Sequence, residues 1–178
     1  LPPHVSFIGG HPMAGSEKRG PSAADPYLFQ NALYVLTPLQ QPPPAYVETF
    51  ARFIKDALGC RHIFLDPSTH DWIVATVSHV PHLLAVALAA LAGEREENTP
   101  GTIQLAAGGF RDMTRIADAP FSIWRDILAT NPESIGVILD TYITILQQIK
   151  DRLKTGSIEE YFEKAARVRY QIPAGKKG

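Results

Sequence analysis

The chain has 178 residues, of which 45% are hydrophobic and 20% are charged, and its formal net charge is −1. This composition is typical of a globular protein with a buried core, and the balanced charge excludes the basic surface with which proteins bind nucleic acid or anionic membranes. The single cysteine, Cys60, excludes an internal disulfide and favours a reducing, cytoplasmic setting.

The first 66 residues predict three short strands and one helix. The strands are expected over residues 5–8, 32–36 and 62–65, which are short apolar runs bounded by glycine, proline or charge. A helix is expected between the prolines at 42–44 and Gly59, with apolar residues at helical spacing. Three strands are too few for an independent nucleotide-binding fold. We therefore interpret this part as the end of a Rossmann-type sheet that begins before Leu1, and the absence of an initiator methionine also indicates a fragment.

The remainder predicts helices, with breaks at residues 93–101 and at Gly156 and with a new helix after Asn131. Ser157 and Glu160 match a capping box for the last helix. The helix over 69–92 is apolar nearly all round, so it must be covered on every side. Its uncharged stretch, 73–92, has two histidines and a proline in its middle and no basic flank, so a buried helix is predicted rather than a membrane span.

The first candidate for chemistry is His11, in the segment GGHPMAGSEK over residues 9–18. The imidazole directly follows a predicted strand, and open α/β sheets place ligands at strand ends. It can act as a base near neutral pH. The alternative is a loop histidine that is satisfied by backbone groups.

The second candidate is the pair His79 and His82 in SHVPH, which lie on adjacent sides of one helical turn. A structural zinc site requires four ligands, and no other cluster completes this one, so no metal is predicted. The pair is interpreted either as core histidines or as one histidine that faces a polar substrate.

The third candidate is the segment GGFRDMTR over residues 108–115, followed by Trp124-Arg125-Asp126. A guanidinium can hold a carboxylate with two parallel hydrogen bonds. Arg111 and Arg125 each precede an aspartate, which favours surface ion pairs. Arg115 has no adjacent acid, which favours a role in ligand binding. No G-x-G-x-x-G, P-loop, H-E-x-x-H or C-x-x-C motif occurs in the chain.

Together these segments resemble the prephenate dehydrogenase family. The matching stretches are GGHPMAGSEKRG, SHVPHLLA and GGFRDMTRIADAPFSIWRDI, and the resemblance extends from Val5 to about residue 153. It implies a mainly α fold: an all-helical dimerisation domain over residues 67–172, preceded by a Rossmann remnant over 1–66 and followed by a flexible tail over 173–178. It also implies a homodimer that oxidises prephenate with NAD, with loss of CO₂, to give 4-hydroxyphenylpyruvate for tyrosine biosynthesis.

The resemblance also implies roles for individual residues. His11 matches the catalytic histidine that binds the hydroxyl group on the substrate ring. The other matches concern the substrate: His82 contacts it, Arg115 holds a carboxylate, Gly108 lines the site, Ser16 and Glu17 belong to an entrance loop, and Trp124 lies near the active site of the partner subunit. The NAD or NADP cofactor is expected to be bound mainly by the N-terminal half that precedes Leu1.

Three other interpretations stay open. The substrate of an arogenate dehydrogenase carries an amino acid side chain in place of the pyruvyl group, and the residues of this chain do not distinguish the two substrates. A non-catalytic helical dimerisation module is the alternative from another class. A metal-binding regulator that uses His79 and His82 is the third.

Overall fold

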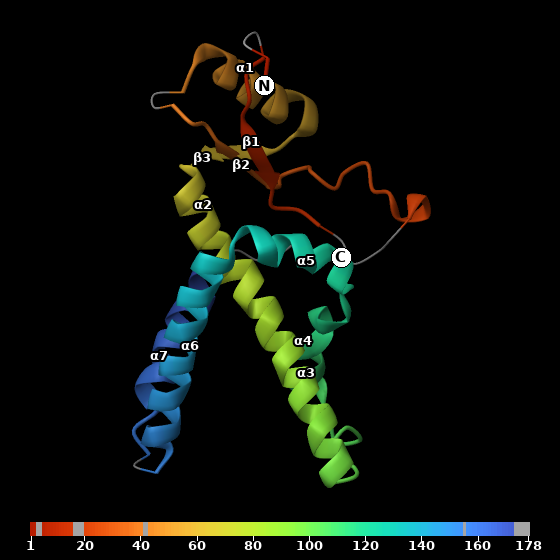
Figure 1. Cartoon of the computed structure of the whole chain (residues 1–178), viewed down its shortest axis with the longest axis vertical. Helices are drawn as coiled ribbons and strands as arrows, with labels where there is room; N and C mark the ends of the chain where they lie inside the picture. Colours follow the sequence, from red (N-terminus) through yellow and green to blue (C-terminus); the bar gives the residue numbers. More distant parts are fainter. Residues whose placement is uncertain (3–4, 16–19, 41–42, 155, 173–178) are drawn as a thin grey trace. The chain divides into compact units, whose positions relative to one another are not determined.

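The computed structural model describes residues 1–2, 5–15, 20–40, 43–154 and 156–172. The chain divides into two compact units, Leu1–Ile135 and Gly136–Gly178. Its fold is mainly helical with one small sheet near the N-terminus, as predicted (Figure 1). Ser16, Glu17 and the predicted tail over 173–178 lie outside the described residues.

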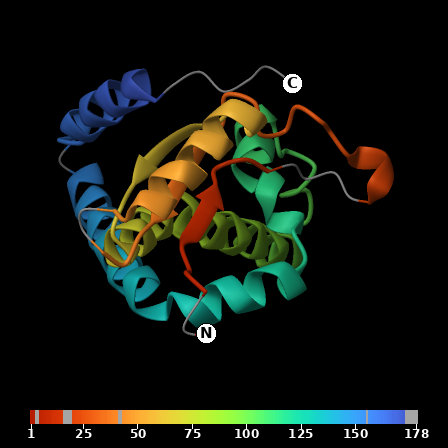
Figure 2. The same ribbon diagram turned by 90° about the horizontal axis from the view of Figure 1, so that it is seen from above.

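The sheet has three strands, β1 (Gly9–Pro12), β2 (Leu33–Thr37) and β3 (Arg61–Phe64), in that order. β1 pairs antiparallel with β2, which places His11 opposite Val35, and β2 pairs parallel with β3. The parallel pair is connected by α1 (Ala45–Leu58), which lies beside the sheet in both ribbon views (Figures 1 and 2). The prediction of a strand over residues 5–8 was wrong. The partner strand β2 pairs from Gly9 onward, so His11 lies inside a strand rather than directly after one.

Two glycines are required at positions that fix this sheet. A Cβ atom on Gly10 would lie 2.8 Å from Cε1 of Tyr34, so the tyrosine ring packs where a side chain would stand. Gly59 follows α1 with a φ of 66°, the left-handed conformation that closes a helix at low cost only for glycine. Its role as the stop of this helix is confirmed.

The core of this region lies between α1 and the sheet. Leu36, Ala51, Ile54 and Cys60 are all buried and pack together. The thiol of Cys60 donates to the carbonyl oxygen of Phe29 over 3.1 Å, so it behaves as a buried packing group.

A long helix follows the sheet and consists of three parts: α2 (Pro67–Val74), the π-helical turn η2 (Ala75–His79) and α3 (Val80–Asn98). The carboxylate of Asp66 caps it by accepting the backbone N–H of Thr69 at 2.9 Å. A break was predicted over residues 93–101, and the helix ends inside that range, at Asn98 rather than at Gly93. The carboxylate of Glu96 then accepts the backbone N–H groups of Gly101 and Ile103, which anchors the loop that follows.

Among the described residues, Pro67–Asn98 is the one helix whose length and composition would allow a membrane span, and its most apolar window is 33% buried. A core helix passes the same test, so the finding is weak evidence for a membrane. The expected complete covering of this helix is not provided by the described chain itself. Val77, Val86 and Leu91 are exposed by 61%, 41% and 48%.

The remaining helical elements are η1 (Pro21–Ala23), α4 (Gly108–Thr114), η3 (Arg115–Asp118), α5 (Phe121–Thr130), α6 (Pro132–Leu153) and α7 (Glu159–Gln171). As predicted, Asn131 directly precedes α6, and its carbonyl accepts the N–H of Ile135. The capping box was wrong: α7 begins at Glu159 without a side-chain cap, and the carboxylate of Glu160 accepts from Arg152 at 3.1 Å instead.

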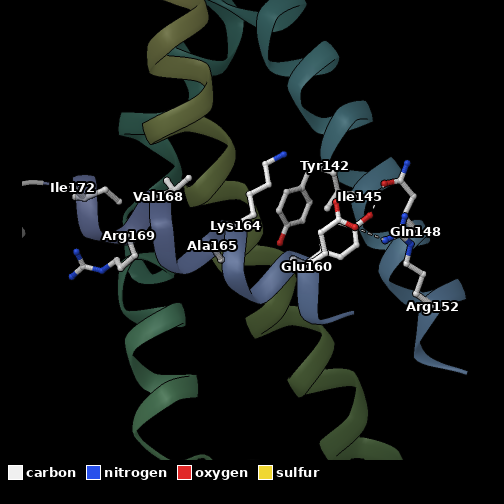
Figure 3. Close-up of a pocket in the computed structure, with 11 residues that line it drawn as sticks. Tyr142, Ile145, Gln148, Arg152, Glu160, Lys164, Ala165, Val168, Arg169 and Ile172 are labelled. Atoms are coloured by element: carbon white, nitrogen blue, oxygen red, sulfur yellow. Dashed lines mark hydrogen bonds and ion pairs between the residues drawn. The ribbon is translucent and has the colours of Figure 1, made fainter. Parts of the chain in front are cut away.

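In the second unit, α6 and α7 border a groove of about 910 Å³ (Figure 3). The hydroxyl of Tyr161 donates to Gln148 over 2.7 Å at one part of it. Tyr142, Ile145 and Val168 contribute to a lining that is more apolar than polar. None of the predicted site residues that the structure describes lines this groove.

Candidate functional site

The site is centred on a contact between the first strand and the long helix. Nδ1 of His11, on β1, lies 2.9 Å from Nε2 of His70, on α2. Nδ1 of His70 lies 2.8 Å from a carboxylate oxygen of Asp71. The two imidazole rings meet edge to face, with centroids 5.2 Å apart. Three side chains from two elements thus form a continuous hydrogen-bonded chain.

Local sequence explains why α2 can provide these groups. Asp66 caps the first turn and Pro67 occupies the first helical position, where its missing N–H has no cost. The helix is therefore fixed from its first turn, and His70 and Asp71 follow at once. The amide of Asn131 donates to the backbone carbonyl of Asp71 over 2.8 Å and holds the same turn from the other side.

The π-helical turn places a third histidine in this region. His79 is the last residue of η2, and it is 9% exposed. Its Nδ1 atom is buried and has no hydrogen-bond partner in the described part of the chain. Single π turns occur often at functional sites, and a buried imidazole nitrogen without a partner is a group that a ligand or a water molecule would satisfy.

His82 lies one turn further along and is stacked on Trp124 from α5. The ring centroids are 3.6 Å apart and the planes differ by 9°. Trp124 also contacts the ring of His79 edge to face, at 6.1 Å. The resemblance associated Trp124 with the active site of the partner subunit. In this structure its ring contacts His79 and His82 of the same chain.

Burial keeps these imidazoles neutral near pH 7. Burial, and then the neighbouring His70, lower the pKa of His11 below its ordinary value. Burial also lowers the pKa of His79, an effect to which His11 and His70 add and which Asp71 opposes. Burial alone lowers the pKa of His82. A neutral imidazole can accept a proton, so the cluster can provide a general base.

The other predicted residues lie on elements that follow the long helix. Gly108 begins α4, with open space around the position of a Cβ, and Arg115 begins η3, which packs against α3. Both are exposed. The predicted ion pair of Arg125 with Asp126 is confirmed at 2.8 Å. Within the described residues, no group of three or more histidine, cysteine or acidic side chains could hold a metal ion.

Sequence reasoning missed His70 and Asp71. Their contact with His11 spans 59 positions along the chain, so no local spacing could show it. A usable signal was nevertheless present: a histidine and an aspartate directly follow a capped helix start after a strand, at Asp66-Pro67-Ser68-Thr69-His70-Asp71.

Comparison with protein-family models assigns both parts of the chain. Residues 1–63 match the model described as the nucleotide-binding domain of prephenate dehydrogenase, and residues 66–166 match its dimerisation domain. The second match alone covers more than half of the 178 residues.

Similarity to individual proteins agrees with these family matches. A prephenate dehydrogenase from Bacillus subtilis is 37% identical over 100% of this chain and 48% of its own length. The crystal structure of A. aeolicus prephenate dehydrogenase with hydroxyphenyl propionate and NAD⁺ has a TM-score of 0.79 at 29% identity, covering 93% of this chain and 57% of that one. Synechocystis arogenate dehydrogenase has a TM-score of 0.73 at 28% identity, covering 92% and 59%. The chain thus spans about half the length of the curated relatives it matches, and it belongs to the prephenate dehydrogenase family.

Proposed function

We propose that the whole protein catalyses the oxidative decarboxylation of prephenate to 4-hydroxyphenylpyruvate in tyrosine biosynthesis, and that this chain provides the substrate site and the dimer interface. The observation that carries the proposal is the imidazole of His11. It is kept neutral by burial and by its neighbour, and one of its nitrogens is held by His70. An imidazole in this state can accept the proton of the hydroxyl group on the substrate ring.

The oxidation also requires a hydride acceptor, for which we propose NAD. The nucleotide-binding match over residues 1–63 and the NAD⁺ complex of the A. aeolicus relative support this class of cofactor. The chain contains no G-x-G-x-x-G motif, so its residues do not fit the pyrophosphate of a dinucleotide. We therefore expect the 178 residues alone to be inactive and assign them no role in binding the pyrophosphate.

The chemistry assigned to this chain is alignment and proton transfer. Prephenate carries two carboxylates, and the guanidinium of Arg115 can bind one of them through paired hydrogen bonds. His11 takes the hydroxyl proton as the carbonyl forms, and loss of CO₂ then makes the ring aromatic, which drives the reaction. We propose supporting roles for His82, Gly108, Ser16, Glu17 and Trp124 around the substrate. His11 lies on β1, His82 on α3 and Arg115 on η3.

A steady-state assay of the full-length protein tests this function. Prephenate and arogenate are each supplied with NAD and with NADP, and formation of the reduced nicotinamide is followed. We expect the highest kcat/KM with prephenate and NAD. Arogenate is included because the arogenate dehydrogenase of Synechocystis has a similar fold. A higher kcat/KM with arogenate than with prephenate would identify arogenate as the substrate. Absence of turnover with all four pairs would favour the non-catalytic dimerisation module.

The proposed organisation has a helical substrate and dimerisation domain over 67–172, preceded by an α/β part over 1–66. We propose that it forms a cytoplasmic homodimer. The support is exposed apolar side chains on the long helix, Val77 on η2 and Leu91 on α3, and separately Ile143 and Leu146 on α6 in the second unit. Clustered exposed apolar side chains are typical of a surface that a partner covers.

A further inference from the structure

The chain of hydrogen bonds from His11 through His70 to Asp71 determines where the protons lie. A neutral imidazole has one N–H and one nitrogen lone pair, whereas a carboxylate only accepts hydrogen bonds. The carboxylate of Asp71 therefore requires the proton of His70 on Nδ1, which is 2.8 Å away. Nε2 of His70 is then a lone pair and accepts from Nδ1–H of His11, over 2.9 Å. Nε2 of His11 is left with its lone pair unprotonated.

We propose that His70 and Asp71 are positioning residues that hold His11 in the tautomer whose Nε2 can accept the substrate proton. The proposal rests on the proposed function, in which His11 is the base. When Nε2 takes the proton, the O–H bond breaks and its electron pair forms the second bond of the carbonyl. A bound nicotinamide would supply the hydride acceptor that this oxidation requires. His11 becomes an imidazolium that still donates Nδ1–H to His70.

The surroundings define how strong this effect is. The side chain of His70 is 17% exposed, and that of Asp71 is 48% exposed. Water therefore competes for the carboxylate, and the effect of Asp71 should be smaller than for a fully buried acid. His11, His70 and Asp71 also act electrostatically on His79, whose pKa is lowered chiefly by burial.

Nitrogen NMR of the histidine rings tests the tautomer without cofactor or substrate. We expect His11 in the 178-residue chain to be protonated on Nδ1 at neutral pH. In Asp71→Asn the amide can also donate to Nδ1 of His70, which reverses the direction of both hydrogen bonds. The rings of His11 should then populate the Nε2–H form. Asp56→Asn, the same change on an exposed position of α1, should leave His11 unchanged.

Kinetics of the full-length enzyme provide the second readout. In a buried triad, loss of the orienting aspartate lowers kcat by about 10⁴. Because Asp71 is partly exposed, we expect Asp71→Asn to lower kcat by only about 10- to 100-fold, with KM within about twofold. His70→Asn should also lower kcat, because it removes the nitrogen that accepts Nδ1–H of His11. Asp71→Glu should recover part of the activity.

The outcomes separate the two proposals. A change of tautomer together with loss of kcat in Asp71→Asn supports positioning. Loss of kcat with the wild-type tautomer would show a merely structural effect and overturn it, as would an unchanged kcat. A wild-type enzyme that oxidises neither substrate, with His11 protonated on Nδ1, would overturn the proposed function while supporting the assignment of the tautomer.

Discussion

At the scale of single residues, the site depends on imidazoles that stay neutral. The pKa values of His11, His79 and His82 all lie below the ordinary value for histidine, chiefly through burial. A base with a lowered pKa remains unprotonated to lower pH. Activity that depends on His11 should therefore persist below the pH at which an ordinary histidine becomes charged, and it should be lost as the pH falls through the lowered value.

The loss of activity at low pH forms the acidic limb of the pH profile, and His11→Asn should abolish this limb. In the full-length enzyme we expect kcat to fall by roughly 10²–10⁴, the usual contribution of a general base, with substrate binding largely intact. Asparagine retains a hydrogen-bonding group but cannot take the proton. The pH profile of kcat is the measurement. His62→Asn, on β3 beside Phe64, is the matched control. A mutant that keeps its acidic limb would transfer the role of base to His82.

Arg115→Lys tests whether Arg115 binds a carboxylate of the substrate. A lysine carries the charge but not the planar fork that binds a carboxylate through two hydrogen bonds. We expect KM for prephenate to rise strongly, because loss of a charged hydrogen-bonded contact typically costs about 2–5 kcal/mol. Arg125→Lys is the control, since Arg125 pairs with Asp126 on the surface. Equal KM values for the two variants would make Arg111 the next residue to test.

At the scale of elements, residues with strong local signals were predicted correctly. Gly59 ends α1 and Asn131 precedes α6 because their conformations are determined by immediate neighbours. The break predicted over residues 93–101 begins later than expected: the helix passes through Gly93, since a single glycine has only a modest cost there, and it ends at Asn98. The capping box predicted for Ser157 and Glu160 is wrong, since α7 has no side-chain cap and the carboxylate of Glu160 accepts from Arg152. Such competition between partners is not visible in a short sequence window.

The candidate site likewise contains residues that local sequence predicts and residues that it does not. His11 and His82 were found through motifs that lie within a few residues. Their partners were not, because His70 reaches His11 across the fold and Trp124 reaches His82 from another helix. The π turn that ends at His79 also has no distinctive residue pattern.

Asn131→Ala tests how the turn beside the site is held. The amide is 9% exposed and donates to the Asp71 carbonyl. Its removal leaves a carbonyl with one partner fewer and should lower the free energy of unfolding by about 1–3 kcal/mol. Asn98→Ala is the matched control, because that amide makes a bond of the same 2.8 Å length in an exposed position. Urea unfolding at one fixed protein concentration makes the comparison, and equal losses would contradict the assigned role.

At the scale of the whole molecule, the sequence predicted an apolar long helix but could not show what covers it. The described chain leaves much of that helix exposed. We expect an obligate dimer, whose interface should bury roughly 2,000 Å² or more. Sedimentation velocity across a dilution series should show a single dimeric species down to micromolar concentration. A stable, folded monomer in that range would contradict the prediction.

The π turn has a consequence for the angular phase of the long helix. A regular α-helix rotates about 100° per residue, so His79, nine positions after His70, would point about 180° away from it. One extra residue accommodated in the π turn reduces this angle to about 80°, and it brings His82 within about 20° of His70 instead of about 120°. If Val77 were deleted and the helix became regular throughout, the three histidines would keep these angles. If the helix became regular without a deletion, the histidines would point in different directions.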